Sequence, residues 1–136
     1  MDGASVMAGI SWLAVVVAAT STFILGGLWY GPLLGRAWMA ASGITEEKAR
    51  QGNMALVFGV SFVLQLLAAL VLEMFIGADA TLAFGIFAGA SAGIAWVSTA
   101  LGVVYLFEQR PFGHWAVNAS YQVVSYTIMG AILGAW

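Results

Sequence analysis

The sequence contains no cysteine, one histidine, and only four basic and six acidic residues among its 136 residues. Without cysteine the chain cannot form a disulfide, a thiolate nucleophile or a cysteine-ligated metal site. One histidine cannot build a multi-histidine metal site within one chain. A net charge of −2 leaves no basic patch for phosphates. We therefore expect no resident metal, no cofactor and no nucleic-acid partner.

The scarcity of charge also excludes a water-soluble domain. Hydrophobic residues make up 62% of the chain and charged residues 7%, whereas soluble domains have about 45–50% and about 25%. The mean hydropathy of +0.99 agrees with this composition. A soluble enzyme and a disordered chain are excluded on the same grounds. The composition indicates an integral membrane protein whose first partner is the lipid bilayer.

Four apolar runs are each long enough to form a membrane-spanning helix, which needs about 20 residues. They cover about residues 6–34, 53–76, 80–107 and 113–136. The runs are too continuous for the alternating pattern of a β-barrel. The first run is not typical of a signal peptide, because no Lys or Arg precedes it and no small-residue cleavage site follows it. Short connections make consecutive helices antiparallel neighbours. The predicted fold is therefore all-α, a single four-helix transmembrane domain in an antiparallel up-down bundle.

The basic residues predict the orientation of this bundle. Three of them fall in the polar loop 35–52 and the fourth, Arg110, falls in the connection 108–112. Because Lys and Arg accumulate in cytoplasmic loops, both loops are predicted to be cytoplasmic and both termini to lie outside a cell inner membrane. Within the first loop, residues 45–50 predict a short helix capped by Thr45. Five aromatic residues mark the inner interface in this interpretation: Trp29, Tyr30, Trp38, Tyr105 and Trp115.

Glycines recur at four-residue spacing in three of the runs, and this spacing favours close helix packing in lipid. One interpretation is that they pack the four helices of one chain together. The other is that the third helix, which has small residues on two faces, also contacts a second subunit. We therefore expect a homo-oligomer or a place in a larger membrane complex. The glycines in question are Gly27, Gly31, Gly85, Gly89, Gly93, Gly130 and Gly134.

Polar residues inside the runs are the candidates for a pore or pocket lining. Polar groups that face lipid are costly, so these side chains should face the bundle or a cavity. In the alternative interpretation, the amides and hydroxyls only hydrogen-bond across helices, at about 0.6 kcal/mol each, and Glu73 extends to the outer interface. The last run presents one arc of five such residues, and the second run adds three. The candidates are His114, Asn118, Tyr121, Gln122, Ser125, Ser61, Gln65 and Glu73.

Several segments resemble a known family. They are Gly26–Trp38, with its Leu-Trp-Tyr-Gly-Pro sequence, Phe107–Pro111, Asn118–Tyr121 and Met129–Trp136. The chain resembles, over nearly its whole length, the bacterial membrane proteins of domain of unknown function 1761. Its middle, from residue 40 to about residue 90, is similar to them in hydropathy only. The resemblance implies a compact four-helix inner-membrane protein. It implies no particular activity, so function has to be argued from the residues.

Two functions from different classes remain open. The first is transport, by an oligomeric channel or small-solute transporter in which the polar arc of the last run lines the path. The second is a non-catalytic accessory or assembly subunit of a larger membrane complex. An enzyme is disfavoured because the sequence offers no carboxylate pair, Ser–Lys or Ser–His pair, or metal-ligand spacing. We assign no catalytic residue.

Overall fold

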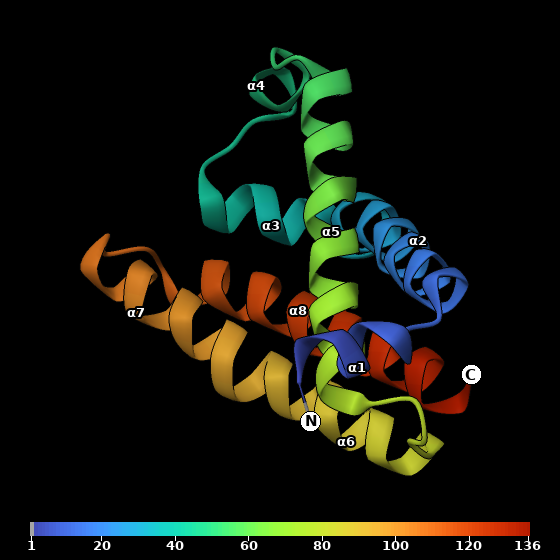
Figure 1. Ribbon diagram of the computed structural model, residues 1–136. Helices are drawn as coiled ribbons and strands as arrows, with labels where there is room; N and C mark the ends of the chain where they lie inside the picture. The colour runs from blue at the N-terminus through green and yellow to red at the C-terminus, as the bar shows by residue number, and fades with distance from the viewer. Residues whose placement is uncertain (1) are drawn as a thin grey trace.

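A computed structural model describes residues 2–136, and within this range the secondary structure is helix joined by loops, without a strand (Figure 1). The all-helical prediction is confirmed. Two short segments, η1 and η2, are π-helical. The elements in chain order are α1 (Gly3–Ala8), α2 (Trp12–Leu28), η1 (Trp29–Leu33), α3 (Gly35–Ser42), α4 (Glu46–Arg50), α5 (Met54–Ile76), α6 (Leu82–Ala92), η2 (Gly93–Ser98), α7 (Thr99–Phe107) and α8 (Phe112–Ala135).

Three helical stretches of the described residues are long and apolar enough to cross a membrane: 12–33, 54–76 and 82–107. The predicted count of four spanning helices is therefore not supported on length and hydropathy together. The fourth helix, α8, has 24 residues and is long enough. Its polar residues lower its hydropathy, and nine of its residues are buried against other helices. α8 is thus the polar centre of the molecule, whereas α2, α5 and α6 are apolar around most of their circumference.

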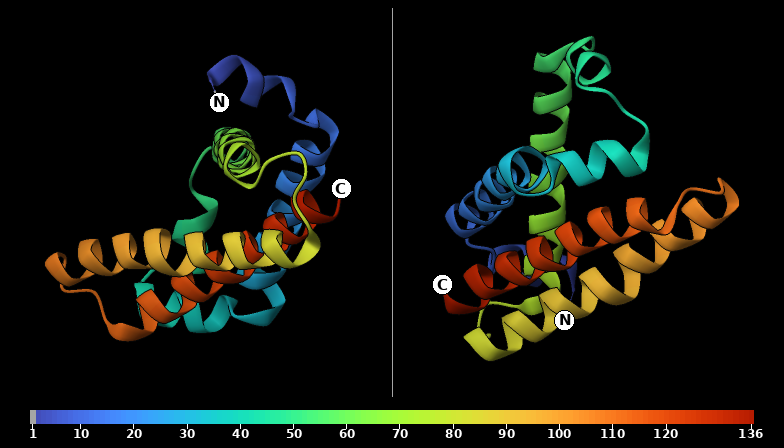
Figure 2. Two further views of the ribbon diagram at one scale, coloured as in Figure 1. Left: turned by 60° about the horizontal axis from the view of Figure 1, so that its bottom comes forward. Right: turned by 180° about the vertical axis from the view of Figure 1, so that it is seen from behind.

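The helices do not form a bundle of nearly parallel rods. The stretch from α6 through η2 to α7 runs alongside α8 in the opposite direction, and α2 packs on another side of α8 (Figures 1 and 2). α5 crosses this arrangement at a steep angle, and the left view of Figure 2 shows it end-on. The antiparallel bundle that the sequence predicted is therefore not the observed architecture.

The first apolar run is not one helix from residue 6 onward. α1 ends at Ala8, and α2 begins only at Trp12, after Ser11. The Ser11 hydroxyl accepts a hydrogen bond from the backbone N–H of Ala14, which caps α2 and fixes its start. α1 has its own cap, because the Asp2 carboxylate accepts from the Ser5 N–H at 2.8 Å. This hydrogen bond lowers the pKa of Asp2 below its ordinary value.

Two π-helical segments interrupt the spans, and each has a local cause. η1 contains Pro32, which lacks the N–H that an α-helix would use. In η2 the hydroxyl of Ser98 donates to the carbonyl oxygen of Gly93, five residues earlier, at 2.7 Å. Such widened turns are frequent at functional sites and wherever a helix must change direction.

Glycine contact between α6 and α8 brings the two backbones closer than any other residue would permit. A Cβ atom on Gly85 would overlap the carbonyl oxygen of Gly130, and one on Gly130 would overlap that of Gly85. A Cβ on Gly134 would lie 2.5 Å from the Thr81 oxygen, and one on Gly93 would lie 2.9 Å from the Val123 Cα. We call Gly85, Gly89, Gly93, Gly130 and Gly134 the glycine contact. By contrast, Cβ positions on Gly27 and Gly31 have no atom within 4 Å.

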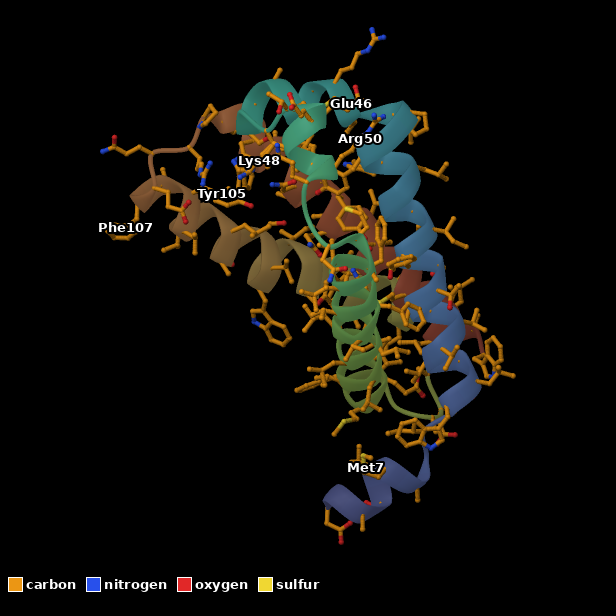
Figure 3. All side chains as sticks on the ribbon, turned by 90° about the horizontal axis from the view of Figure 1, so that it is seen from above. Met7, Glu46, Lys48, Arg50, Tyr105 and Phe107 are labelled. Atoms are coloured by element: carbon orange, nitrogen blue, oxygen red, sulfur yellow. The ribbon has the colours of Figure 1, made fainter. Side chains whose placement is uncertain are left out.

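The loop between η1 and α5 contains more helix than expected. The predicted short helix is confirmed as α4, with the Thr45 hydroxyl accepting from the Lys48 N–H at 3.0 Å. Glu46 and Arg50 form an exposed ion pair on it (Figure 3). α3, at residues 35–42, was not predicted. Gly43 caps its C-terminal end, with a φ of 76° in the left-handed region that glycine adopts without strain.

The turn from α7 to α8 is tightly specified. The Gln109 N–H donates to the Leu106 oxygen at 3.1 Å, and the Arg110 N–H donates to the Tyr105 oxygen at 2.9 Å. These two bonds form a Schellman motif, which places Gln109 at a φ of 57°. Pro111 then precedes α8, with an extended backbone. The direction of the Arg110 backbone is therefore fixed by the turn.

The buried core is made of small and medium residues, while large apolar residues face outward. Ala14, Ala18, Ala19 and Ala69 are completely buried. Outward-facing residues include Leu106 and Phe107, which are 78% and 86% exposed; Phe107 lies at the end of α7, next to the turn to α8 (Figure 3). Exposed apolar surface on this scale would aggregate a soluble protein. In a bilayer, lipid tails cover it, and small interior residues allow helices to approach.

Candidate functional site

Asn118 lies at the middle of a set of polar contacts around α8. The Tyr30 hydroxyl donates to its Oδ1 at 2.6 Å, and its Nδ2 donates to the Tyr105 hydroxyl at 3.1 Å. These partners come from η1 and α7, so one amide connects three helical segments, of which η1 is far from the other two in sequence. All three residues are partly buried. In this structure, Asn118 uses both ends of its amide within the chain.

Tyr121, one turn further along α8, connects α8 to α2 and α5. Its hydroxyl donates to the backbone oxygen of Thr22 at 2.9 Å. Gln65 on α5 donates to the same hydroxyl through Nε2 at 3.5 Å, and its Oε1 accepts from the Thr22 hydroxyl at 3.2 Å. Gln65, Thr22 and Tyr121 thus form a closed set of contacts at the point where three helices meet. The sequence predicted Gln65 and Tyr121 as polar candidates but did not identify Thr22.

Two indole rings add further contacts to the same centre. Trp29 donates through Nε1 to the Val117 backbone oxygen at 3.1 Å, and Trp115 donates to the Ser98 oxygen at 2.9 Å. Both acceptors are carbonyls inside helices. The sequence assigned these tryptophans to the membrane interface as anchors, and it gave no signal for their acceptors. The structure adds interhelical hydrogen bonds to that assignment.

The other members of the polar arc lie in different surroundings. The His114 ring is 8% exposed and stacks on Tyr105 with a centroid distance of 4.6 Å. Ser125 is 1% exposed, and its hydroxyl has no hydrogen-bond partner among the described residues. Gln122 and Ser61 are half-buried. Within the arc, Asn118 and Tyr121 therefore each form hydrogen bonds to other helical segments. The remaining members do not share these contacts.

Glu73 occupies a separate site at the C-terminal end of α5. Its side chain is 5% exposed, and its Oε2 has no hydrogen-bond partner within residues 2–136. It lines a pocket of about 180 Å³ between the C-terminal end of α5 and the α1 segment. None of the described residues that line this pocket takes part in the hydrogen bonds of Asn118 and Tyr121. The other lining residues are Ser5, Val6, Gly9, Ile10, Met74, Gly77 and Ala78.

The electrostatics of this pocket favour a positive occupant. None of the described residues that line it is basic. The C-terminus of a long helix carries a partial negative charge, and Glu73 lies in the last turn of the 23-residue α5. A buried carboxylate without a partner is costly. The negative charge of Glu73 is therefore compensated only when the carboxyl group carries a proton or when a cation lies beside it.

The polar side chains that the described residues bring to this pocket are the Glu73 carboxyl group and the Ser5 hydroxyl. Among residues 2–136 there is no group of three His, Cys, Asp or Glu side chains that could hold a metal ion. A single carboxylate in an apolar pocket can exchange a proton for a small monovalent cation. The volume of the pocket, about 180 Å³, is suited to a small ion.

Comparison with known proteins adds a family but no activity. The chain matches, over residues 13–134, the family described as protein of unknown function (DUF1761). The match includes the Asn118 centre and Glu73, and it begins after α1. No curated protein and no solved structure matches the chain.

Proposed function

The chain belongs to the DUF1761 family of proteins of unknown function, and we propose that this member is a membrane transporter of small cations. The observation that carries the proposal is the buried Glu73 carboxyl group, which faces a pocket and has one oxygen without a partner. An acid within an apolar span is expensive and is a functional candidate by default. The proposal has two parts, the placement in the membrane and the role of Glu73.

In the first part, α8 is the fourth spanning helix, and the protein lies in a cell inner membrane. The length of α8 supports this, since 24 residues at 1.5 Å each cover a hydrocarbon core of about 30 Å. Its polar groups bond to other helices instead of meeting lipid. α4 and the α7–α8 turn lie toward one end of the molecule, and α1 and the C-terminus lie toward the other (Figure 1). This separation supports cytoplasmic loops at 35–52 and 108–112, with both termini outside.

Cysteine labelling tests the placement, because the natural chain has no cysteine. Ser42→Cys at the end of α3 should react only from the cytoplasmic side. Ala4→Cys in α1 should react only from the outer side. An impermeant maleimide applied to intact cells and to inverted vesicles distinguishes the two. If both cysteines react from one side, the four-span orientation is wrong.

In the second part, Glu73 holds either a proton or a cation, and the two exchange one for one. Binding of a cation beside the carboxylate then releases the proton, and the total charge of the site stays constant. The pocket lies at the end of α5 where we place the outer surface, so it is close to one aqueous phase. Movement of the α1 segment, which covers the pocket and has no residue that is fully buried, would change access to it.

Proteoliposomes loaded with guanidinium test this exchange, because guanidinium cannot cross the bilayer as a neutral base. An outward guanidinium gradient should drive protons inward, and a trapped pH dye should report acidification. Glu73→Gln should reduce the rate at least tenfold, since an amide cannot release a proton. The matched control is Glu108→Gln, which removes a half-exposed carboxylate from the α7–α8 turn and should leave the rate unchanged.

One result would overturn transport: wild-type acidification no faster than in protein-free liposomes with either guanidinium or tetramethylammonium as the probe. That result favours the second candidate function, a non-catalytic accessory or assembly subunit. Equal flux in wild type and Glu73→Gln, faster than in protein-free liposomes, would instead overturn the role of Glu73. The hydrogen bonds of Asn118 and Tyr121 within the chain support that candidate, since they use as structural contacts the groups that a path would need.

A further inference from the structure

We propose that a membrane phospholipid binds along the groove between α7 and α8, with its phosphate on Arg110 and one acyl chain between the helices. The groove is separate from the Glu73 pocket and independent of the transport proposal. It consists of two adjoining cavities of about 630 Å³ and 330 Å³, both lined by Gly102, Leu106 and Trp115. The second cavity ends at Arg110 and Pro111.

The long part of the groove is suited to a hydrocarbon chain. Its hydroxyl groups are all engaged within the protein: Thr99 donates to the Ala95 oxygen, Ser120 to the Ala116 oxygen and Ser98 to the Gly93 oxygen. The Trp115 N–H is also bonded, to the Ser98 oxygen. The hydroxyl groups and the indole N–H of this long part are therefore not free to donate to a polar ligand. From Trp115 to Val123, the α8 side of the groove extends about 12 Å.

Small residues form the base of the groove, and large ones form its edge. Gly102, Ala116 and Ala119 leave the space that larger side chains would fill. Ile94 and Val103 are each 56% exposed beside it. An acyl chain in this position contacts apolar atoms on both sides, which a chain on a smooth helix surface does not.

Arg110 supplies the charge complementarity at the open end. Its Nε donates to a Glu108 carboxylate oxygen at 3.0 Å, and the side chain is 43% exposed. A guanidinium has five N–H donors, so the terminal amino groups are available to a phosphate in the paired geometry that guanidinium favours. The Schellman turn fixes the Arg110 backbone at the end of the groove. The backbone that carries the phosphate-binding side chain is thus held at the end of the chain site.

Native mass spectrometry of the purified full chain, with added phosphatidylglycerol or with diacylglycerol of the same chains, tests the proposal. Wild type should retain the phospholipid in preference to diacylglycerol. Arg110→Gln should lower phospholipid retention about fivefold, the effect of one basic residue near a membrane surface, and leave diacylglycerol retention unchanged. The matched control, Lys48→Gln on the exposed α4 helix, should leave both unchanged.

A second variant tests the chain site. Ala116→Phe fills the groove and should reduce retention of both lipids, whereas Ala55→Phe on the exposed face of α5 should not. Equal retention in wild type, Arg110→Gln and Ala116→Phe would overturn the proposal. So would a dimer that Ala116→Phe dissociates without any change in lipid retention, since a second copy of the chain would then occupy the groove. Because Arg110 is exposed, Arg110→Gln should fold and keep the test decisive.

Discussion

Gly89→Leu is expected to prevent α6 from packing on α8 and to leave the chain largely unfolded in mild detergent. A Cβ atom on Gly89 would overlap the backbone oxygen of Tyr126 and lie 3.2 Å from the Cα of Gly130. Backbone cannot move aside as a flexible side chain can. Overpacking typically costs 1–3 kcal/mol, and we expect at least about 3 kcal/mol here. The measurement is the midpoint of thermal unfolding by circular dichroism, and even Gly89→Ala should lower it.

The matched control is Gly27→Leu, at a helical glycine in the same sequence spacing. No atom lies within 4 Å of a Cβ on Gly27, so the added side chain should extend toward lipid. We expect its unfolding midpoint to stay within a few degrees of wild type. If Gly27→Leu and Gly89→Leu proved equally stable, the close approach of α6 and α8 would not contribute to the stability of the fold.

Gly27 and Gly89 also show how much of the helix packing can be predicted from the sequence alone. Four-residue spacing identifies helices with a small-residue face, and it does so equally for Gly27–Gly31 and Gly85–Gly89. Of these four glycines, Gly85 and Gly89 meet the backbone of another helix, and Gly27 and Gly31 have no atom within 4 Å of a Cβ position. The partner depends on which helices come together in space, and spacing along one helix does not contain this information. The sequence therefore predicts candidates for close packing but does not select among them.

Helix boundaries show a similar division. Composition predicted an all-helical chain, and the apolar runs located α5 and the α6–α7 stretch within a few residues. The break between α1 and α2 was missed, because no proline or charge lies between residues 9 and 11 to indicate it. The cap at Ser11 decides this break. The steep crossing of α5 was also missed, since hydropathy measures length and not direction.

The candidate polar groups were predictable by position but not by partner. A regular helix places Asn118, Tyr121 and Gln122 on one arc of α8, and the cost of polar groups in lipid predicted that this arc faces the bundle or a cavity. The partners Tyr30 and Tyr105 come from segments 88 and 13 residues away. Both tyrosines looked like interfacial anchors, because an aromatic residue near a span end is typical of that role. Hydrogen bonds between such distant residues follow only from the tertiary fold.

Asn118→Leu is expected to destabilise the protein by about 1–2 kcal/mol, the second large effect. The substitution removes an acceptor for the Tyr30 hydroxyl at 2.6 Å and a donor to the Tyr105 hydroxyl at 3.1 Å. Two partly buried hydroxyls then lose their partner, and an unsatisfied buried group costs about 1–3 kcal/mol. Interhelical hydrogen bonds in membranes average about 0.6 kcal/mol each, which places the sum of two bonds near the lower end. Thermal unfolding in a single detergent measures the change.

Gln122→Leu is the matched control for Asn118→Leu. Gln122 is half-buried on the same arc of α8, but the central contacts to η1 and α7 run through Asn118. If the arc serves to connect helices, Asn118→Leu should lower stability while Gln122→Leu changes it by less than about 0.5 kcal/mol. If the arc lines a path, both variants should remain stable and both should lose flux in the guanidinium assay. A loss of stability confined to Asn118→Leu, with flux unchanged in Gln122→Leu, would place transport at Glu73 alone and leave α8 as the helix that holds the others in position.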